Sequence, residues 1–215
     1  MLSPRRTHVV RGLAALIATG GLVVAGTAAA DDPPPATSVS PDAAQPAPVA
    51  EVQPDQAEAL RVLRRDVRPS DALPPAAEAA ASSERFGRNP ALARAVRTTN
   101  GTGWVVPGDG IVCLVAPDPV DGFGTTCAPT AVVAAGGLTL IQADDHEATA
   151  TTLVPDGATV VLEQETGARS RVTPDNTGVT RVDASEADHL EVVTEQGRAD
   201  TPLPDADEMA AGGVR

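Results

Sequence analysis

The sequence predicts a mainly β protein, a small antiparallel β-sandwich or open barrel, preceded by a short N-terminal helical arm and a disordered linker. Beyond residue 100, short runs rich in Val, Thr, Ile and Leu alternate with clusters of Gly, Pro and Asp, which is typical of strands joined by tight turns. The only two cysteines, Cys113 and Cys127, flank one of these loops. Before residue 100, apolar residues recur at helical spacing or give way to Pro and Ala.

The composition restricts both the core and the partners. All sixteen basic residues are arginine, and one Trp and two Phe are the only aromatic side chains among 215 residues. We therefore expect a core built from Val, Leu, Ile and Ala. The net charge of −13 argues against nucleic-acid or anionic-membrane binding, because phosphate contacts need clustered cations. The composition indicates no other partner.

Residues 1–30 have the pattern of a signal peptide. Three arginines accompany an uncharged, largely apolar stretch, and Ala28-Ala29-Ala30 supplies the small residues that a signal peptidase requires. We place the cleavage between Ala30 and Asp31, which predicts a secreted or extracytoplasmic protein without a membrane span. The residues after the arginine pair lack the twin-arginine pattern, so a Sec signal is favoured. The alternative is an uncleaved membrane anchor, because the uncharged stretch just suffices to cross a bilayer.

Residues 31–54 form the predicted disordered linker, since half of them are Pro or Ala and none is aromatic. Residues 55–99 form the predicted helical arm. Within it we expect one helix over 55–68, in which Asp55 is the N-cap and Glu58 completes a capping box. A second helix is expected over 76–83. A third begins at Asn89-Pro90 and runs to about residue 98.

The first of these helices carries an apolar face formed by Leu60, Leu63 and Val67. The arm from 57 to 99 holds eight arginines and five acids, whereas residues 144–215 hold sixteen acids and five arginines. The two regions have opposite charge, and a helix this short is marginal alone. We therefore expect the arm to dock on the β domain through its apolar face.

Residues 100–197 form the predicted β domain. Val105 and Val106 lead into a Pro-Gly-Asp-Gly turn, and residues 111–115 lead out of it, which predicts a hairpin. A loop then leads to a short strand that ends at Cys127, and residues 129–137 form a helical turn or a loop. Residues 198–215 are the predicted acidic, flexible tail. The other strand candidates are 138–143, 149–154, 158–164, 169–173, 179–183 and 189–195.

Several segments resemble uncharacterised secreted proteins of GC-rich actinobacteria. The resemblance covers roughly residues 58–165 and is carried by VLRR, DALP, NPALAR, GWVVPGDGIVCLV, a second Cys and LVPDGATVV. None of these motifs is a catalytic signature. The resemblance implies export, a paired cysteine bridge and a β-rich domain.

The two cysteines predict a structural disulfide. Cys113 and Cys127 are too far apart for the CxxC motif that lowers a thiol pKa, which argues against the alternative of a redox pair. In an exported chain, a bond closing a loop of about fifteen residues stabilises the fold by roughly 3 kcal/mol in the chain-entropy model.

No metal site or cofactor is predicted. Zinc has little support because only His146 and His189 remain after the signal is removed, and they show no ligand spacing. Calcium is the strongest metal candidate, but its ligands do not follow an EF-hand pattern. The acidic residues that offer oxygen ligands are Asp118, Asp121, Asp144, Asp145 and Glu147.

Catalytic residues are not predicted either. The chain has no GxSxG motif, and Ser170 and Ser185 are the only serines in the β domain. Asp188 and His189 are adjacent only in sequence, and adjacent residues of a strand face opposite ways. We therefore predict an exported, non-enzymatic binding or structural module of the cell envelope or medium. The alternative is an extracellular hydrolase with an unrecognised site.

The signal-peptide interpretation predicts that exported protein begins at Asp31. Intact-mass analysis of material from the medium or envelope should show the loss of residues 1–30. Recovery of the full-length chain in the membrane fraction would instead show that the segment is an uncleaved anchor.

Overall fold

The computed structural model describes most of the arm, most of the β domain and a strand that follows it. The predicted signal peptide with its cleavage site at Ala30 and Asp31, nearly all of the linker, and residues 205–215 lie outside the described residues. The described ranges are 49–81, 87–119, 122–143, 148–164, 166–184 and 187–204.

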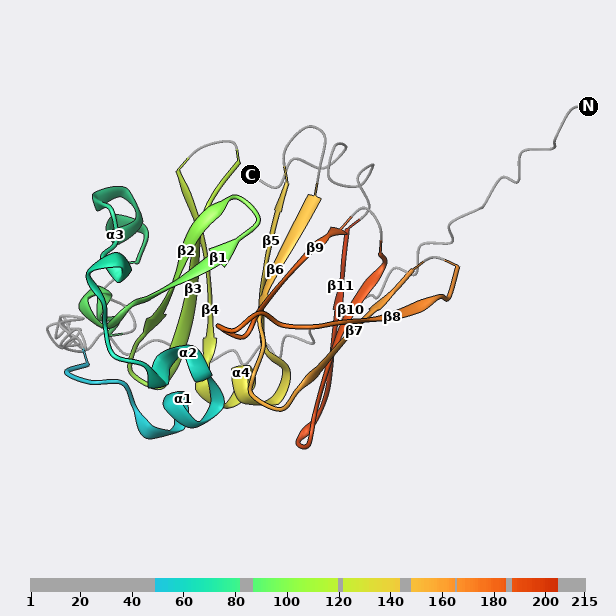
Figure 1. Cartoon of the computed structure of the whole chain (residues 1–215), viewed down its shortest axis with the longest axis horizontal. Coiled ribbons are helices and arrows are strands. Elements are labelled where there is room, and N and C mark those ends of the chain that lie inside the picture. The colour runs from blue at the N-terminus through green and yellow to red at the C-terminus, as the bar shows by residue number, and fades with distance from the viewer. Residues whose placement is uncertain are drawn as a thin grey trace, which may run out of the picture. The chain divides into compact units, whose positions relative to one another are not determined.

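The described residues form three antiparallel sheets, and these confirm the predicted mainly β class with open rather than closed sheets (Figure 1). The first sheet has the order β1-β2-β3-β4, with β1 Arg94–Thr98, β2 Gly101–Pro107, β3 Ile111–Pro117 and β4 Phe123–Pro129. The middle sheet has the order β5-β6-β9, with β5 Leu138–Ala143, β6 Ala148–Leu153 and β9 Val179–Asp183. The outer sheet has the order β11-β10-β7-β8, with β7 Thr159–Glu163, β8 Arg169–Val172, β10 His189–Thr194 and β11 Gly197–Pro202.

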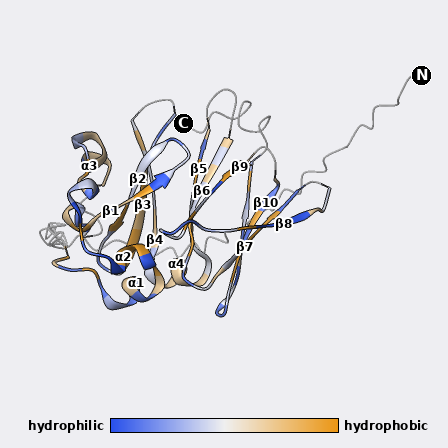
Figure 2. Cartoon of the chain, in the orientation of Figure 1, coloured by the Kyte–Doolittle hydropathy of each residue, from blue (hydrophilic) through white to orange (hydrophobic). Residues whose placement is uncertain are grey.

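The middle sheet is buried on both faces. Alternate residues of a strand point to opposite faces, so Leu153 of β6 packs toward the first sheet and Ala150 packs toward the outer sheet. The first core is rich in Leu and Val and lies between the first and middle sheets. The second core is rich in Ala and Val and lies between the middle and outer sheets. Figure 2 shows the resulting contrast between the hydrophobic β3 and the hydrophilic β8.

Four α-helices accompany the sheets within the described ranges. Helices α1 Pro54–Ala59 and α2 Arg61–Arg64 contribute to the first core, and α3 Pro75–Ala81 covers the opposite face of the first sheet beside Trp104 and Cys113. α3 confirms the helix predicted over 76–83 as far as Ala81, and residues 82 and 83 lie outside the described residues. For residues 129–137 the sequence predicted a helical turn or a loop, and the structure has a helix there, α4 Thr130–Gly136. It ends at Gly137, whose φ of 78° suits glycine.

The helix predicted over 55–68 is wrong in extent and in its cap. Gln53 is the N-cap and Pro54 takes the first turn, where a missing N–H costs nothing. Leu60 has extended dihedrals, φ −128° and ψ 108°, and separates α1 from α2. Because the helix is interrupted at Leu60, the side chains of the adjacent Val62 and Leu63 are both buried in the first core.

The third predicted helix is also wrong beyond its first turn. Asn89 does cap a turn, accepting a hydrogen bond from the Ala91 N–H at 3.0 Å, but that turn is a 3₁₀ helix that ends at Leu92. The following residues form β1 and pair with β2, with Val96 opposite Gly103. Burial of Val96 in the first core outweighs the helix propensity of the Ala- and Arg-rich segment.

The flexible tail predicted from Arg198 is wrong in its first part. Residues Gly197–Pro202 form β11, which pairs with β10 along its whole length through a tight hairpin. Leu203 follows in the second core, and its N–H donates to the Asp188 carbonyl at 2.7 Å. These contacts extend the fold beyond the boundary expected at residue 197.

The arm docks on the β domain as predicted, through apolar residues that close the first core. Leu60, Val62 and Leu63 are buried there, whereas Val67 is 47% exposed and does not belong to the expected stripe. Gln56 is fully buried, and its Nε2 donates to the carbonyls of Gly108 at 2.9 Å and Ile111 at 2.8 Å. The glutamine therefore fixes α1 to the β2–β3 hairpin.

Two groups of ion pairs accompany this docking. Arg61 Nε lies 2.7 Å from Oδ1 of Asp156, and Arg64 bonds the same carboxylate in the turn between β6 and β7. Arg65 holds Asp71 in a fork with both N···O distances at 2.6 Å. The opposite charges of the two regions thus meet at one carboxylate, Asp156, whereas Arg65 and Asp71 pair within the arm itself.

Asp71 is the most buried acid of the arm, with 1% of its side chain exposed. Burial alone would raise its pKa, but Arg65 and the N–H groups of Ala95 and Arg68 all donate to its carboxylate and lower the pKa to about 2. The Ala95 carbonyl in turn accepts from Arg65 at 3.2 Å. Asp71 and Arg65 therefore satisfy both backbone groups of Ala95 on the outer edge of β1, as a neighbouring strand would.

Leu63→Asp should lower the free energy of unfolding of the whole described domain by several kcal/mol, because it places a charge in the first core. Arg64→Ala should lower it by only about 0–1 kcal/mol, since Arg64 is half exposed and Asp156 keeps Arg61. Urea unfolding of both variants tests this difference. A Leu63→Asp protein that melts like the parent would contradict the docking.

Asp71 should make stability fall in acid. Because its pKa is lower in the folded than in the unfolded chain, its contribution of about 2 kcal/mol is complete above about pH 5 and is lost as the pH falls toward 2. Urea unfolding between pH 6 and pH 2.5 should therefore show the gap between the parent and Asp71→Asn narrowing. Asp66→Asn, at an exposed acid of the same arm, is the control. A gap that stays constant across this range would refute the assignment.

Candidate functional site

The face of the outer sheet that points away from the second core is charged. Leu190 and Val192 of β10 point into the core, so the intervening His189, Glu191 and Val193 lie on the opposite face. The pairing of the four strands places arginines and acids beside them. We call this surface the charged face; its charged members are Glu163, Arg169, Arg171, His189, Glu191, Arg198 and Asp200.

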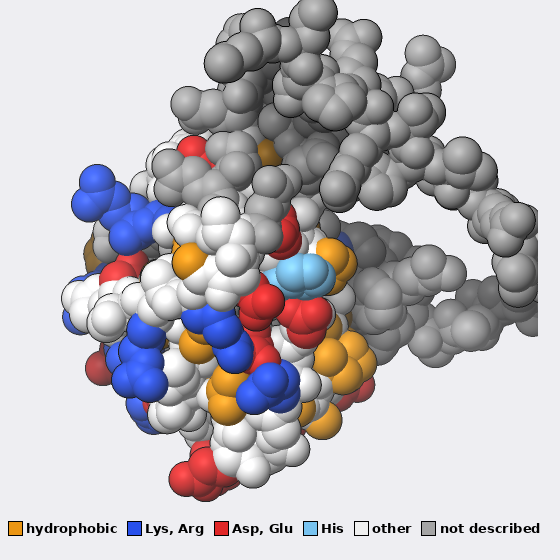
Figure 3. Space-filling model, turned by 90° about the vertical axis from the view of Figure 1, so that its right-hand side faces the viewer, with side chains coloured by type: hydrophobic (Ala, Val, Ile, Leu, Met, Phe, Trp, Pro, Cys, Tyr) orange, Lys and Arg blue, Asp and Glu red, His pale blue; other side chains and the backbone are white. Residues whose placement is uncertain are grey.

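Glu191 is the centre of the charged face. Only 10% of its side chain is exposed, and its carboxylate accepts from Arg198 Nε at 2.6 Å and from Arg169. Arg169 Nε also lies 3.5 Å from Oε2 of Glu163. These pairs join β7, β8, β10 and β11, so the network holds all four strands of the sheet in one arrangement. Figure 3 shows arginine and acidic side chains interleaved on this side of the molecule.

Two shallow cavities open along the charged face. The first has a volume of about 440 Å³ and is lined by Val161, Val193 and the three arginines around Glu191. The second cavity has a volume of about 300 Å³ and is lined by Glu163, His189 and Asp200. It shares Arg169, Glu191 and Arg198 with the first. Because they share these residues, the two form one groove with an apolar part between Val161 and Val193.

Arg171 differs from the other two arginines of the groove. Arg169 and Arg198 are both paired with Glu191, whereas no described residue makes an ion pair or side-chain hydrogen bond with Arg171. Its side chain is exposed and lies opposite Val161 of β7. Arg171 therefore supplies a cation that is available to a ligand.

The charge of this face contrasts with that of the chain. The protein has a net charge of −13, yet the charged face has three arginines against three acids. Three of the five arginines between residues 144 and 215 lie here. Because these charges balance, the charged face repels anions much less than the rest of residues 144–215 does.

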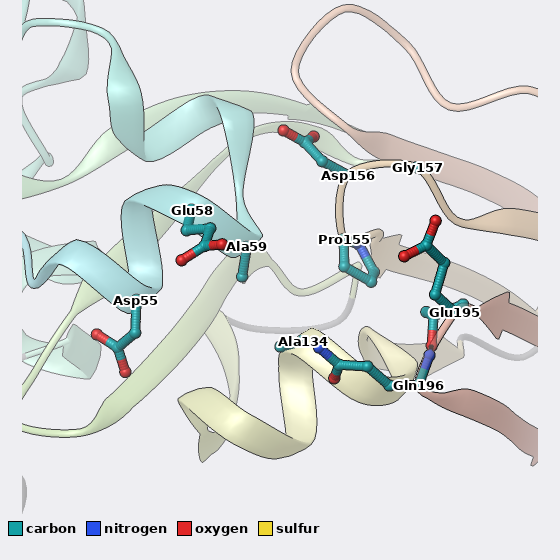
Figure 4. A pocket seen from close by; sticks show the side chains of 10 residues that line it. Asp55, Glu58, Ala59, Ala134, Pro155, Asp156, Gly157, Glu195 and Gln196 are labelled. Atoms are coloured by element: carbon teal, nitrogen blue, oxygen red, sulfur yellow. Dashed lines mark hydrogen bonds between the residues drawn. The ribbon is translucent and has the colours of Figure 1, made fainter.

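A separate cavity, of about 470 Å³, lies between α1, α4 and two turns. Asp55, Glu58 and Glu195 line it, and in Figure 4 their carboxylates point in different directions. Asp156 also lines it but is bonded to the arginines of the arm. In the described part of the chain, no group of three or more His, Cys, Asp or Glu side chains could hold a metal. We therefore regard the charged face as the better candidate.

The predicted disulfide is confirmed. Cys113 and Cys127 are bonded with an S–S distance of 2.05 Å and lie opposite each other in β3 and β4. The buried Arg88 guanidinium lies beside the bond, with Nη1 3.7 Å from each sulfur. The bond thus joins two strands that are already paired, beneath α3, and supports the fold rather than the groove.

The other residues singled out in the sequence do not form a catalytic group in the described ranges. His189 Nδ1 lies 3.2 Å from Oδ2 of Asp200, rather than beside a nucleophile. Ser170 lies opposite Leu162, which packs into the second core, so its side chain does not share the outer face with His189. Asp118 starts a turn closed by its N–H and the Gly122 carbonyl. Outside the described residues lie Asp121, Asp144, Asp145, His146, Glu147 and Ser185.

The sequence interpretation missed the charged face as a site. A signal was present, because Arg169 and Arg171, then Glu191 and Val193, and then Arg198 and Asp200 follow the two-residue period of a strand face. The strand that contains Arg198 was, however, assigned to the tail. Because β11 was not predicted, Arg198 was not recognised as the second partner of the Glu191 carboxylate.

Comparisons with protein-family models, curated proteins and solved structures gave no match. Among the residues that the structure describes, no helix is long and apolar enough to cross a membrane. The function must therefore be argued from the charged face itself.

Proposed function

We propose that this chain is an exported, non-enzymatic binding module of the cell envelope or medium, and that the charged face is its binding surface. The observation that carries the proposal is the exposed groove on the outer sheet, with Arg171, which pairs with no described residue. The middle sheet is covered on both faces, and α3 covers the first sheet, but no described helix or strand covers the charged face.

Export is supported by two independent features. Residues 1–30 have the pattern of a signal peptide that ends at Ala30. The Cys113–Cys127 disulfide is a bond that persists in oxidising compartments and is rare in the cytosol. An exported protein with a bound partner is retained at the envelope or acts in the medium.

Binding fits the groove better than catalysis does. Glu191 and its two arginines hold one another in place, so they form a rigid set of charges rather than groups available for proton transfer. Electrostatic complementarity of this kind contributes specificity and the rate of association. The apolar part between Val161 and Val193 adds area that a ligand can remove from water.

One observation favours the alternative of an extracellular hydrolase. The His189 imidazole lies beside the Asp200 carboxylate, the two residue types of a base and its orienting acid, although His189 Nδ1 makes no hydrogen bond to it. The two side chains are about half exposed, and the described part of the charged face offers no Ser or Cys beside them. A hydrolase would therefore have to activate water there.

The binding proposal predicts that Arg171→Glu weakens binding while leaving the fold intact. Purified mature protein should bind to isolated envelopes or to a component of the medium, and Arg171→Glu should bind about tenfold more weakly, since a lost charge contact costs about 1.4 kcal/mol. Arg97→Glu is the matched control, because it changes the net charge equally at the one exposed position of β1.

Equal weakening by both variants would show that only net charge matters and would contradict the proposal, as would unaltered binding by Arg171→Glu. Hydrolysis of ester or peptide substrates that is lost in His189→Ala and kept in Arg171→Glu would establish the hydrolase instead.

A further inference from the structure

Strand β8 ends the outer sheet, and one of its edges has no partner in the described part of the chain. It pairs with β7 alone, with Leu162 opposite Ser170 and Val160 opposite Val172. The Gln164 N–H donates to the Ala168 carbonyl at 2.9 Å at the start of this hairpin. In an antiparallel pair, hydrogen-bonded positions recur every second residue, so Ser170 and Val172 face β7. The backbone N–H and C=O groups of Arg169 and Arg171 therefore point to the free edge.

The outer edge of β1 has side-chain hydrogen bonds to its backbone that the free edge of β8 lacks in the described part of the chain. On the edge of β1, the carboxylate of Asp71 accepts from the Ala95 N–H at 2.8 Å, and Arg65 donates to the Ala95 carbonyl. These side chains occupy the place of a further strand. No described side chain does the same for Arg169 or Arg171, so β8 remains open to a strand from outside.

The side chains of β8 determine which strand can pair there. Arg169 and Arg171 are two residues apart and lie on the charged face, while the exposed Ser170 lies on the other side. A second copy of β8 would bring arginines against arginines, and like charges directly opposite are destabilising. An incoming strand with acidic residues at alternate positions would instead meet Arg171 and the outer side of Arg169.

We propose that β8 accepts an extended acidic segment of a partner protein as a fifth strand of the outer sheet, with Asp or Glu at alternate positions toward the charged face. The inference rests on the proposed function and specifies the partner. Backbone hydrogen bonds from Arg169 and Arg171 contribute affinity, and their guanidinium groups contribute selectivity. The partner segment has acids at i and i+2 and lacks Pro at the positions whose N–H groups face β8.

The test uses short synthetic peptides with a blocked N-terminus and C-terminus and the purified mature chain. The first peptide has Glu at alternate positions with Thr and Val between them. The second replaces each Glu with Lys. The third keeps the Glu residues but carries N-methyl groups on the amides that would donate to β8, so that its charge is unchanged and strand pairing is blocked. Affinity is measured by titration calorimetry at physiological salt.

The acidic peptide should bind, and both the Lys peptide and the N-methylated peptide should bind at least about tenfold more weakly. Arg171→Glu should weaken the acidic peptide to the same degree, whereas Arg97→Glu should leave its affinity unchanged. Amide hydrogen exchange should slow at Arg169 and Arg171 when the acidic peptide is bound, a change that surface electrostatics alone would not produce.

Equal affinity for the acidic and N-methylated peptides would overturn strand addition and leave the charged face as a binding surface. Absence of peptide binding together with Arg171-dependent binding to envelopes would also overturn it, and the proposed function would stand. Binding that appears only after deletion of residues 205–215 would identify this chain's own acidic segment as the occupant. A dimer that Arg171→Glu dissociates would identify a second copy; either result contradicts a foreign partner.

Discussion

Open antiparallel sheets leave unpaired backbone N–H and C=O groups at their edges, and much of this structure follows from how the chain treats that constraint. β1 lies beside β9, and β4 lies beside β5, so the first and middle sheets shield each other's edges. Where β1 remains open, Asp71 and Arg65 bond Ala95 in place of a strand. The arm therefore completes the first sheet as well as its core, whereas no described segment covers the free edge of β8.

Apolar burial and polar contacts have different roles in the arm. Each of Leu60, Val62 and Leu63 contributes about 1.5–3 kcal/mol when removed from water. The exposed pair between Arg64 and Asp156 contributes at most about 1 kcal/mol. The polar contacts instead determine position, because a buried Asp71 without Arg65 would destabilise the fold. Apolar contacts thus supply most of the docking energy, and hydrogen bonds select one geometry.

Local patterns predicted the strands well and the junctions poorly. β5 and β9 agree residue for residue with 138–143 and 179–183, since alternation and turn residues are local signals. The break at Leu60, the strand at Val96 and the strand after Gly197 depend on distant partners. The same holds for the site: the charges of Arg169 and Arg198 are visible in the sequence, but their meeting at Glu191 needs the order β11-β10-β7-β8.

The net charge of −13 repels an acidic partner, but this repulsion is weak at β8. At physiological ionic strength charges are screened beyond about 8 Å, so a ligand at this edge responds mainly to the nearest groups. Those groups are Arg171, which no described residue pairs, and Arg169, whose charge is shared with Glu163 and Glu191, while Arg198 also bonds Glu191. The distant acids lower the association rate of an acidic partner, whereas the arginines next to β8 determine which partner remains bound. Recognition on an acidic protein therefore depends on where its few cations lie rather than on their total.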